Sequence, residues 1–568
     1  MKLLLKGCFM KLFAIVICLL FSGYSHAFVD MKNANYSHSW VDLKLDGTGF
    51  DLQLKRTYNS RSLHNGLFGF GWCSDYETKL QVTPEGNIKI IVCGGGNEIE
   101  YISAASGAAV KNTIKTIMRN LKSSKKFTQQ NLMTIQKRLS SDVWEREKYA
   151  RQFKIKKDVR AGVRYIAFGR DKESMVLKNN TFKRSLPDGS YQNFNIKGQM
   201  TYMFDKNNNY LKLTYSPSGQ LNKVSDNNGR SISFVIDKKS KKVSQVKGPK
   251  GMLLTYNYKN EDLVYAKNAW KNVYRYKYDD LHNLIRVDYP DKTNKTISYN
   301  KNKDWVIGFK DRSNCKETYK YVLDQKDPMN KYYSEVIKKC EGKVTNQSRY
   351  EFVHKKNPDG SRYLARTKST VNGKISEVRY HPKFGKAMSV RNNNSQVKFE
   401  YFKNGELKAK HEPARSLNFT YKNKCKKVSQ VVTKYYRFDR KTASKTKQIK
   451  KLVKTVKTNF TYEAPKCNLQ TAVNTTGQKV KLKYDRNGRI VSIVDQAKKV
   501  VNIKYDLKIG KPKLITRPGI GTIQVTYNPA GQINKVDSKE GPIVASQVAG
   551  IFSNLIEIIS PATSELGI

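Results

Sequence analysis

Apolar and polar residues alternate in short runs along most of this chain. Residues 480–484 read VKLKY and residues 523–527 read IQVTY, so every second side chain is apolar or aromatic. A period of two places these side chains on one face of a β-strand and the polar ones on the other. The pattern predicts half-buried strands, each with one apolar and one solvated face.

The strands belong to a longer repeating unit. Residues 211–224 read LKLTYSPSGQLNKV, residues 480–493 read VKLKYDRNGRIVSI, and residues 523–536 read IQVTYNPAGQINKV. Each copy has a strand ending in Tyr, a turn with Gly, and a second strand, so each is predicted to be a hairpin. The residues that define the repeat are Tyr215, Gly219, Tyr278, Asp279, Tyr484, Asp485, Gly488, Tyr527 and Gly531.

Weaker copies keep the same spacing of about 21 residues. The tyrosines at this spacing are Tyr258, Tyr278, Tyr299 and Tyr319, then Tyr380, Tyr401 and Tyr421, then Tyr462, Tyr484, Tyr505 and Tyr527. A single hairpin is marginally stable in water, whereas hairpins side by side bury a continuous apolar face. We therefore expect a mainly β fold, in which tandem hairpins form a long spiralling sheet or a partial hollow shell.

Residues 107–160 interrupt the β pattern. Ile114, Ile117 and Leu121 are spaced for one face of a helix, and so are Leu132, Ile135 and Leu139. Lys and Arg are frequent at the remaining positions, so this segment is predicted to be a basic helical hairpin. Two roles stay open for it: a decoration packed on the β module, or a surface for an anionic partner or envelope.

The first 27 residues are typical of a secretory signal peptide. Lys2, Lys6 and Lys11 precede an apolar run at residues 12–21, and Ser25-His26-Ala27 forms a small-x-small cleavage site. The apolar run is too short to cross a bilayer, and no transmembrane anchor is expected later in the chain. We expect an exported protein, located outside the cell, at its surface or in the periplasm. The true start is Met1 or Met10.

Six cysteines remain after removal of the signal peptide: Cys73, Cys93, Cys315, Cys340, Cys425 and Cys467. An even number of cysteines in an oxidising compartment indicates disulfides. Fifteen connectivities are open, and pairing neighbours along the chain closes the shortest loops.

The net charge is strongly positive. It is +59, and three of the lysines that contribute to it belong to the signal peptide. The excess of basic over acidic residues is spread along the chain. A solvated lysine coat explains this charge, and so does adhesion to an anionic glycan or envelope polymer. No Arg-rich motif or nucleic-acid fold signature is present, so dedicated nucleic-acid recognition is not expected.

The repeats resemble those of a known family. Tyr484-Asp485 and Tyr278-Asp279, with Gly488 following, resemble the YD repeat of Rhs and teneurin-type proteins. Residues 51–61 (DLQLKRTYNSR) and 66–72 (GLFGFGW) resemble the module that opens many Rhs-type polymorphic toxins, and residues 185–191 (SLPDGSY) resemble the segment leading into the repeats. The resemblance implies a large β-sheet wound into a hollow shell, which in toxin members encloses a C-terminal effector.

The chain departs from the toxin pattern at its C-terminal end. The core-closing motif of toxin members is not found, and about 40 residues follow Tyr527, which is too few for an effector domain. A separate cargo or companion polypeptide is therefore the expected partner.

The sequence offers no recognisable catalytic constellation. The histidines are scattered, and nucleophile elbows, phosphate-binding loops and metal-ligand spacings are not found. Glu98 and Glu100 are interpreted as strand decoration and Gly94-Gly95-Gly96 as a turn. No catalytic, cofactor or metal residues are assigned, and the chain is not expected to be an enzyme.

These patterns define six segments. They are a signal peptide (1–27), an N-terminal β module (28–106), a basic helical insertion (107–160), a connecting β segment (161–190), the repeat array (191–540) and an apolar tail (541–568). The expected function is that of an exported scaffold, a structural or encapsulating β-shell of a polymorphic-toxin-like system. The alternatives are an adhesin for carbohydrate or anionic envelope polymers and, with less support, a glycosidase.

Overall fold

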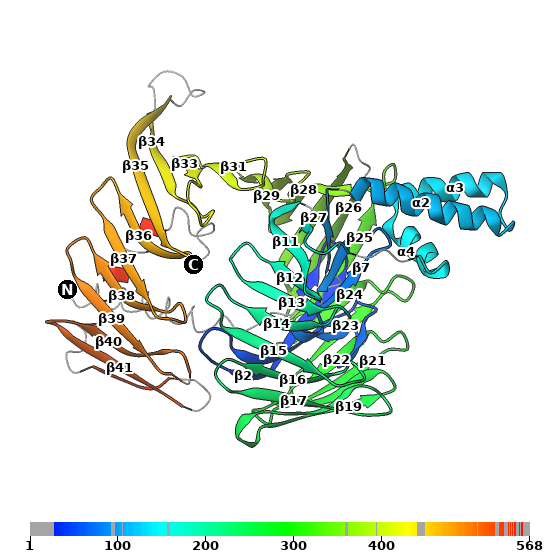
Figure 1. Cartoon of the computed structure of the whole chain (residues 1–568), viewed down its shortest axis with the longest axis horizontal. Helices are drawn as coiled ribbons and strands as arrows, with labels where there is room; N and C mark the ends of the chain where they lie inside the picture. Colours follow the sequence, from blue (N-terminus) through cyan, green and yellow to red (C-terminus); the bar gives the residue numbers. More distant parts are fainter. Residues whose placement is uncertain are drawn as a thin grey trace. The chain divides into compact units, whose positions relative to one another are not determined.

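The computed structural model describes most of the chain after the predicted signal peptide (Figure 1). The described residues are 28–92, 97–104, 106–155, 159–167, 169–357, 362–393, 395–439, 449–507, 509–528, 533–538, 544, 546, 548, 550–552, 556, 558 and 559. Residues 1–27, Cys93, Gly94-Gly95-Gly96 and Gly531 lie outside them.

The fold is mainly β, as the alternation predicted. Strands make up 56% of the chain and helices 11%. Thirty-six strands, β7 to β42, form one long antiparallel sheet in which each strand neighbours the next along the chain. This order is the one expected of tandem hairpins laid side by side.

Two compact units divide the chain. The larger unit contains Asp30–Asn35 and Asn59–Ser416, and the smaller unit contains Met1–Val29, Tyr36–Tyr58 and Leu417–Ile568. The predicted N-terminal module is therefore shared, because its central hairpin belongs to the smaller unit.

The strands of the larger unit are β4 (Asn65–Gly66), β5 (Gly69–Phe70), β6 (Trp72–Ser74), β7 (Lys79–Val82), β8 (Ile88–Val92), β9 (Asn97–Ile102), β10 (Arg164–Ala167), β11 (Arg170–Lys178), β12 (Thr181–Ser185), β13 (Tyr191–Asn195), β14 (Met200–Phe204), β15 (Tyr210–Tyr215), β16 (Leu221–Asp226), β17 (Ser231–Ile236), β18 (Val243–Lys247), β19 (Leu253–Lys259), β20 (Asp262–Lys267), β21 (Val273–Tyr278), β22 (Leu284–Asp288), β23 (Asn294–Tyr299), β24 (Val306–Lys310), β25 (Lys316–Leu323), β26 (Lys331–Cys340), β27 (Lys343–Lys356), β28 (Arg362–Val371), β29 (Lys374–Tyr380), β30 (Ala387–Asn392), β31 (Ser395–Tyr401) and β32 (Leu407–His411).

The strands of the smaller unit are β2 (Asn35–Leu45), β3 (Leu52–Asn59), β34 (Gln430–Asp439), β35 (Ile449–Glu463), β36 (Asn468–Asn474), β37 (Lys479–Tyr484), β38 (Ile490–Asp495), β39 (Val500–Tyr505), β40 (Pro512–Arg517), β41 (Gly521–Tyr527) and β42 (Ile533–Ser538). Strands β1 (Phe28–Asp30) and β33 (Arg415–Thr420) span the boundaries between the units, and two short 3-10 helices lie at Asp75–Glu77 and Pro249–Gly251.

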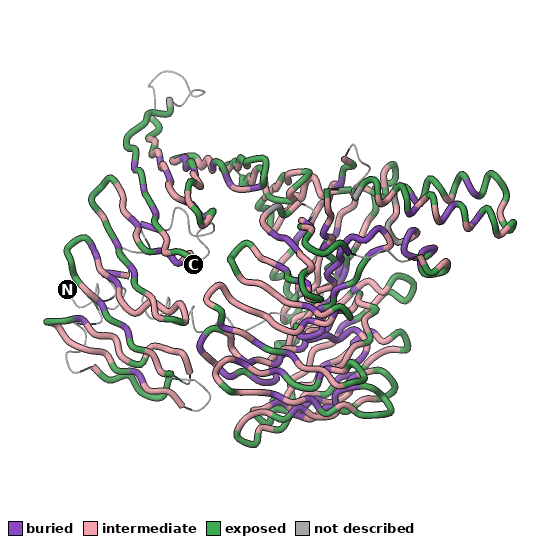
Figure 2. Tube along the Cα trace, in the orientation of Figure 1, coloured by how far each residue is buried: buried purple, intermediate pink, exposed green. Residues whose placement is uncertain are grey.

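Burial follows the predicted faces of the strands. In β37, Val480 and Leu482 are buried, Tyr484 is half-buried, and Lys481 and Lys483 are exposed. Figure 2 shows buried and exposed positions alternating along many strands. The apolar side chains thus gather on one face of the sheet, because each unit repeats the same alternation.

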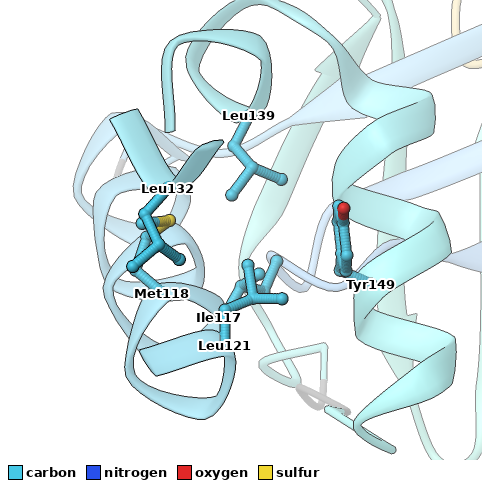
Figure 3. Packing of buried hydrophobic residues seen from close by; sticks show 6 residues of the cluster. All are labelled: Ile117, Met118, Leu121, Leu132, Leu139 and Tyr149. Carbon is cyan, nitrogen blue, oxygen red and sulfur yellow. The ribbon is translucent and has the colours of Figure 1, made fainter. Parts of the chain in front are cut away.

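The helical insertion has three helices rather than the predicted two. They are α2 (Ser106–Ser123), α3 (Gln129–Ser141) and α4 (Val143–Gln152). Buried residues of all three helices form one core, comprising Ile117, Met118, Leu121, Leu132, Leu139 and Tyr149 (Figure 3). Helix α4 was missed because its buried face includes charged residues, Arg146 and Glu147, which hide the apolar period.

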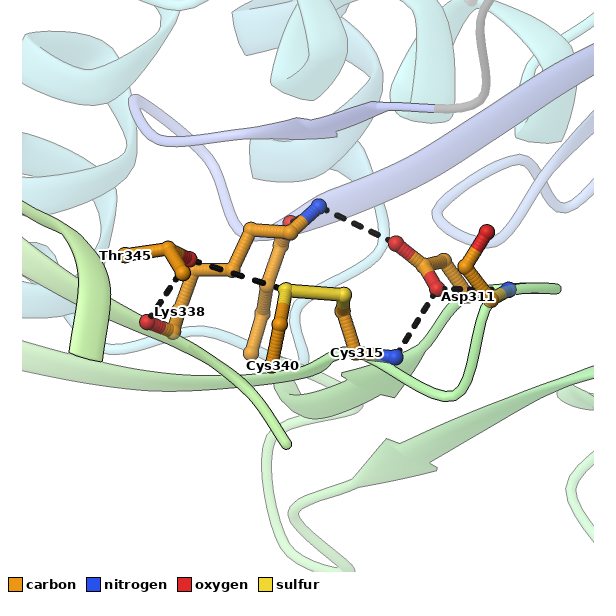
Figure 4. The surroundings of a disulfide bond; sticks show 7 residues. Asp311, Cys315, Lys338, Cys340 and Thr345 are labelled. Carbon is orange, nitrogen blue, oxygen red and sulfur yellow. Dashed lines mark hydrogen bonds and ion pairs between the residues drawn. A yellow bond between two sulfur atoms is a disulfide. The ribbon is translucent and has the colours of Figure 1, made fainter. Parts of the chain in front are cut away.

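Two disulfides join neighbouring cysteines. Cys315 is bonded to Cys340, 25 residues later, and Cys425 to Cys467, 42 residues later. Cys73 is also disulfide-bonded. Beside the first bond, the Cys315 amide donates to Asp311 Oδ1 at 3.0 Å, and Lys338 Nζ contacts Asp311 Oδ2 at 3.0 Å (Figure 4).

None of the helices within the described residues is long and apolar enough to span a bilayer. In the predicted apolar tail, the described residues Val544, Val548, Ile551, Ile558 and Ile559 are buried.

Candidate functional site: the repeat tyrosines and the N-terminal segment

In eight of the described hairpins, a tyrosine hydroxyl donates a hydrogen bond to a backbone carbonyl of the preceding hairpin. The Tyr484 hydroxyl donates to the Leu469 carbonyl at 2.7 Å, fifteen residues earlier in the chain. The same bond to the residue fifteen positions back is made by Tyr215, Tyr258, Tyr278, Tyr299, Tyr321, Tyr505 and Tyr527, at 2.6–3.2 Å. We call these residues, with Tyr484, the repeat tyrosines. Burial raises the pKa of the Tyr484 hydroxyl, so it remains a donor at neutral pH.

A β-bulge accompanies nearly every repeat tyrosine. The register between β37 and β38 shifts between Lys483 and Tyr484, so that Tyr484 opposes Ile490 while Lys483 opposes Ser492. Equivalent shifts immediately precede Tyr215, Tyr258, Tyr278, Tyr299, Tyr505 and Tyr527. A bulge changes the direction of the side chains beside it. Here it accompanies the ring whose hydroxyl reaches the previous hairpin.

The turns after Tyr484 and Tyr278 are each closed by the aspartate that follows the tyrosine. Asp485 Oδ1 accepts from the amides of Asn487 and Arg489, both at 2.9 Å. Asp279 Oδ1 accepts from Leu281 at 3.0 Å and Asn283 at 2.9 Å. Gly488 completes the first turn with φ +80° and Gly219 the equivalent turn with φ +81°, a conformation that favours glycine. The aspartates are thus structural groups of the turns.

The tyrosine spacing did not identify every equivalent residue. The repeat tyrosine of β25 is Tyr321, whose hydroxyl donates to Val306 O at 2.8 Å, whereas the expected Tyr319 hydroxyl contacts Glu317 instead. The reason is that β25 pairs with the long strand β26 without a bulge. Tyr380, another expected member, hydrogen-bonds to Thr367 at 3.1 Å rather than to a preceding backbone carbonyl.

In the larger unit, the N-terminal segment (residues 59–82) and residues 31–34 contact repeats that are far away in sequence. Leu80 bonds to Gly198, residues 67–72 contact residues 243–278, and residues 31–34 contact residues 306–334. Residues 31–34 and 59–82 therefore cross successive hairpins of the larger unit in broadly reverse order.

Two aromatic residues of the GLFGFGW motif anchor this segment. Phe68 and Trp72 are fully buried, and their rings lie 5.2 Å from that of Tyr256 and 5.1 Å from that of Tyr276. Trp72 Nε1 donates to the hydroxyl of the repeat tyrosine Tyr278 at 2.8 Å. The GLFGFGW motif is thus hydrogen-bonded directly to one of the repeat tyrosines.

The backbone of the segment also bonds directly to the repeats. The Phe70 amide donates to Glu261 O at 3.0 Å, and the Leu80 amide donates to Gly198 O at 2.9 Å. Both approaches require glycine. A Cβ on Gly69 (φ +99°) would lie 2.6 Å from Glu261 O, and a Cβ on Gly198 (φ +78°) would overlap Leu80 O.

Glu77 fixes the shape of the segment itself. Its Oε1 accepts from the Leu67 amide at 2.7 Å and its Oε2 from the Ser74 amide at 2.9 Å. His64 Nε2 lies 3.3 Å from the same Oε1. The turn that presents Phe68 and Trp72 is therefore held by a carboxylate, a role that no sequence pattern revealed.

His64, Cys73 and Glu77 form the one candidate metal-binding group found among the described residues. Their ligand atoms lie within 4.8 Å of one another. A cysteine binds a metal as its thiolate, whereas the Cys73 sulfur is held in a disulfide. These residues do not form a metal site in this state.

A second interaction missed from sequence is the buried cluster of Tyr101, Glu173 and Arg184. Arg184 Nη2 lies 2.6 Å from Glu173 Oε1, and Arg184 Nε donates to the Tyr101 hydroxyl at 2.6 Å. Burial raises the pKa of Glu173, but hydrogen bonds from Tyr101 and Arg184 outweigh it and hold the pKa below its usual value. Its partners lie 72 and 11 residues away, so sequence spacing gives no signal.

The two glutamates of β9 make contacts of the kind expected of strand decoration. Glu98 forms an ion pair with Lys89 at 3.4 Å, and Glu100 accepts a hydrogen bond from Asn87 at 3.0 Å. Burial raises the pKa of Glu100.

One part of the chain matches a described family. Residues 27–101 match a family described as "Domain of unknown function (DUF6531)". No curated protein matches the chain. Among solved structures, it is similar to "Crystal Structure of TcdB2-TccC3-TEV", with 10% identity, a TM-score of 0.41, and coverage of 94% of this chain and 29% of that one.

It is also similar to a mutant Photorhabdus luminescens Tc holotoxin pore, with 9% identity, a TM-score of 0.30, and coverage of 87% of this chain and 29% of that one. The chain thus spans less than a third of the length of these two structures.

Proposed function

We propose that this chain is an exported, non-enzymatic scaffold whose repeats form a β-wall against its own N-terminal segment. The observation that carries the proposal is the contact between Trp72 and the repeat tyrosine Tyr278, at the centre of a segment that crosses the hairpins in broadly reverse order. The aromatic rings, hydroxyls and amides in this contact pack against one another and form hydrogen bonds. These are structural interactions, as expected of a scaffold.

The proposed wall works with a separate cargo or companion polypeptide in a toxin-like system. Two observations support this role. The segments DLQLKRTYNSR and GLFGFGW resemble the opening module of Rhs-type toxins, and residues 27–101 match the DUF6531 family.

Export is part of the same proposal. The signal-peptide pattern of residues 1–27 supports it, and so do the disulfides Cys315–Cys340 and Cys425–Cys467. Disulfides persist in oxidising compartments and are rare in the cytosol.

The test is co-expression of the full chain with the products of its neighbouring genes. With the wild-type chain, we expect a stable complex in which one such product resists protease. With the Trp72→Ala variant, we expect this protection to be lost. Trp270→Ala is the matched control, because Trp270 is 47% exposed. The proposal would be contradicted if the chain purified without any of these products and if protease digested each product as fast as in the absence of the chain. Hydrolysis of a glycoside by the pure chain would contradict its non-enzymatic part.

A further inference from the structure

The first two helices of the insertion carry cations without any carboxylate. Between Ser106 and Ser141 the basic residues are Lys111, Lys115, Arg119, Lys122, Lys125, Lys126, Lys137 and Arg138, and no Asp or Glu is present. Separation of charge on this scale creates a local positive potential, which evenly mixed charges do not. This region therefore differs from a lysine coat spread over a whole surface.

Four of these cations form a line on α2. Lys111, Lys115, Arg119 and Lys122 are separated by four, four and three residues, which places them on one face of the helix. All four are exposed, and none forms an ion pair with a carboxylate of the described residues. We call these four residues the α2 basic stripe.

Cations elsewhere in the larger unit are often paired with acids. Lys338 lies 3.0 Å from Asp311 and 3.3 Å from Glu317, and Arg349 lies 3.1 Å from Glu335. The same unit thus neutralises many of its strand cations locally and leaves the α2 basic stripe uncompensated.

The insertion that carries the stripe is fixed to the β-sheet by buried ion pairs. Arg146 of α4 contacts Glu85 at 2.6 Å, and Glu147 contacts Lys89 of β8 at 2.5 Å. All four side chains are less than a tenth exposed. In Figure 1 the helices α2 and α3 extend away from the sheet. A rigid mount of this kind presents the stripe in one orientation.

The apolar face of α2 is already used. Ile117, Met118 and Leu121 pack against Leu132, Leu139 and Tyr149 in the core of the insertion (Figure 3). The helix therefore has no free apolar face to insert into a bilayer, unlike an interfacial amphipathic helix. Any partner of the stripe is bound by charge, and that binding must weaken with salt.

We propose that the α2 basic stripe docks the protein on a surface of anionic phospholipid headgroups. Lipid phosphates are laterally mobile and can gather under a line of cations, each of which contributes to binding. Three of the four stripe residues are lysines, compact point charges suited to such phosphates. The stripe has no aromatic side chain on which bases could stack, which disfavours single-stranded nucleic acid. This docking role goes beyond the scaffold role proposed above.

The test is co-sedimentation of the full chain with vesicles of three parts phosphatidylcholine and one part phosphatidylglycerol. We expect binding at low salt, release at about 0.5 M salt, and no binding to pure phosphatidylcholine vesicles. The variant K111Q/K115Q/R119Q/K122Q should bind roughly a thousandfold less tightly. Glutamine is a good helix former, so α2 should be retained.

The matched control changes the net charge by the same amount on the sheet. K481Q/K483Q/K504Q/K513Q removes four lysines from exposed positions of β37, β39 and β40 and should bind vesicles as the wild type does. K111R/K115R/K122R keeps the charge of the stripe and should also bind. Should the four-fold glutamine variant unfold, K115E/K122E gives the same change in charge with two substitutions and should lose binding equally.

Three results would overturn the proposal. If the stripe variant and the sheet control lost binding equally, vesicle binding would depend on the net charge of the protein and not on the α2 basic stripe. Absence of wild-type binding to the anionic vesicles would remove the lipid partner. Binding to duplex DNA without binding to the vesicles would assign the stripe to nucleic acid.

Discussion

The hydroxyl of each repeat tyrosine forms a bond that connects two hairpins. The ring of Tyr484 lies half-buried on the apolar face, and its hydroxyl satisfies the Leu469 carbonyl of the preceding hairpin. The alternation of side chains predicts the facing of the ring. It does not predict the acceptor, because a carbonyl fifteen residues away comes close only when the neighbouring strand is in place.

Removing this hydroxyl should have a measurable cost. Tyr484→Phe keeps the ring but loses the bond to Leu469, and we expect a destabilisation of about 1 kcal/mol. Tyr484→Ala should cost a few kcal/mol, since it also removes the packed ring. Amide exchange in β37 and β38 measures both. Tyr435→Phe, at a 37% exposed tyrosine, is the control, and equal effects at the two positions would refute a role for the hydroxyl.

Lys295 of β23 should make stability depend on alkaline pH. Burial and the nearby Arg312 lower the pKa of Lys295 to about 8. The unfolded chain then binds more protons than the folded one between pH 8 and the ordinary lysine pKa of 10.5, so this residue makes stability rise with pH across that window.

Lys295→Met should accordingly raise the melting temperature by a few degrees at pH 7, where the half-buried charge is present in the wild type. The advantage of the variant should shrink as the pH rises above 8. Melting curves between pH 7 and pH 9.5 measure this, below the range in which tyrosines ionise. Lys277→Met, at an exposed lysine of β21, should show no such trend. A constant difference across the pH range would refute the assignment.

At the scale of elements, sequence patterns identify those whose burial follows a single period. The strands with alternating residues were predicted, as were the faces of α2 and α3, because Ile114, Ile117 and Leu121 recur at helical spacing. Helix α4 was not predicted as separate, since it buries Arg146 and Glu147 in ion pairs with the sheet. Charged residues that form a buried ion pair look like an exposed polar face in the sequence. Their burial becomes visible only when the partner residues of the sheet are known.

The contact between Leu80 and Gly198 should tolerate no side chain. Gly198→Ala would place a Cβ against Leu80 O, so we expect loss of the Leu80–Gly198 hydrogen bond and a destabilisation of several kcal/mol. Gly229→Ala is a matched control, because Gly229 has the same φ of +78° and nothing within 4 Å of the added Cβ. Denaturant unfolding should separate the two variants. Equal losses would mean that backbone strain alone accounts for the effect.

The disulfide between β25 and β26 should stabilise their pairing. Cys315 and Cys340 close a loop of 25 residues, and loops of this size are associated with roughly 3 kcal/mol of stabilisation. The variant C315S/C340S should melt earlier, and a reductant should lower its melting temperature less than that of the wild type. An unchanged melting temperature in the double variant would show that the strands hold the loop without the bond.

At the scale of the whole molecule, the N-terminal module is divided between two units. Its β2–β3 hairpin lies in the smaller unit, where Lys511 pairs with Asp46 at 2.6 Å and Arg489 donates to Thr48 at 3.3 Å. Residues 59–82 lie in the larger unit. Sequence motifs located the module, but not its partners, since contacts between residues separated by more than a hundred positions leave no local spacing to read.

Deleting residues 28–82 should therefore expose apolar surface in both units. We expect the shortened chain to aggregate and to bind a hydrophobic dye, because Tyr256 and Tyr276 lose Phe68 and Trp72. Replacing residues 104–163 by a short turn is the control. Strands β9 and β10 pair directly through Ile102 and Ile166, so this deletion should leave the sheet folded. Dye binding by the control alone would contradict this view of the module.

The contacts of residues 31–34 and 59–82 with the repeats also determine the order in which these residues can dock during synthesis. Leu80 can meet Gly198 once about 120 further residues have emerged, whereas Met31 must wait for Ser334, some 300 residues later. Within the larger unit, residues 31–34 are thus secured last, and docking proceeds backwards from Leu80 as synthesis moves forwards. For the exported scaffold proposed above, that leading stretch must be kept from aggregating until its final neighbours arrive.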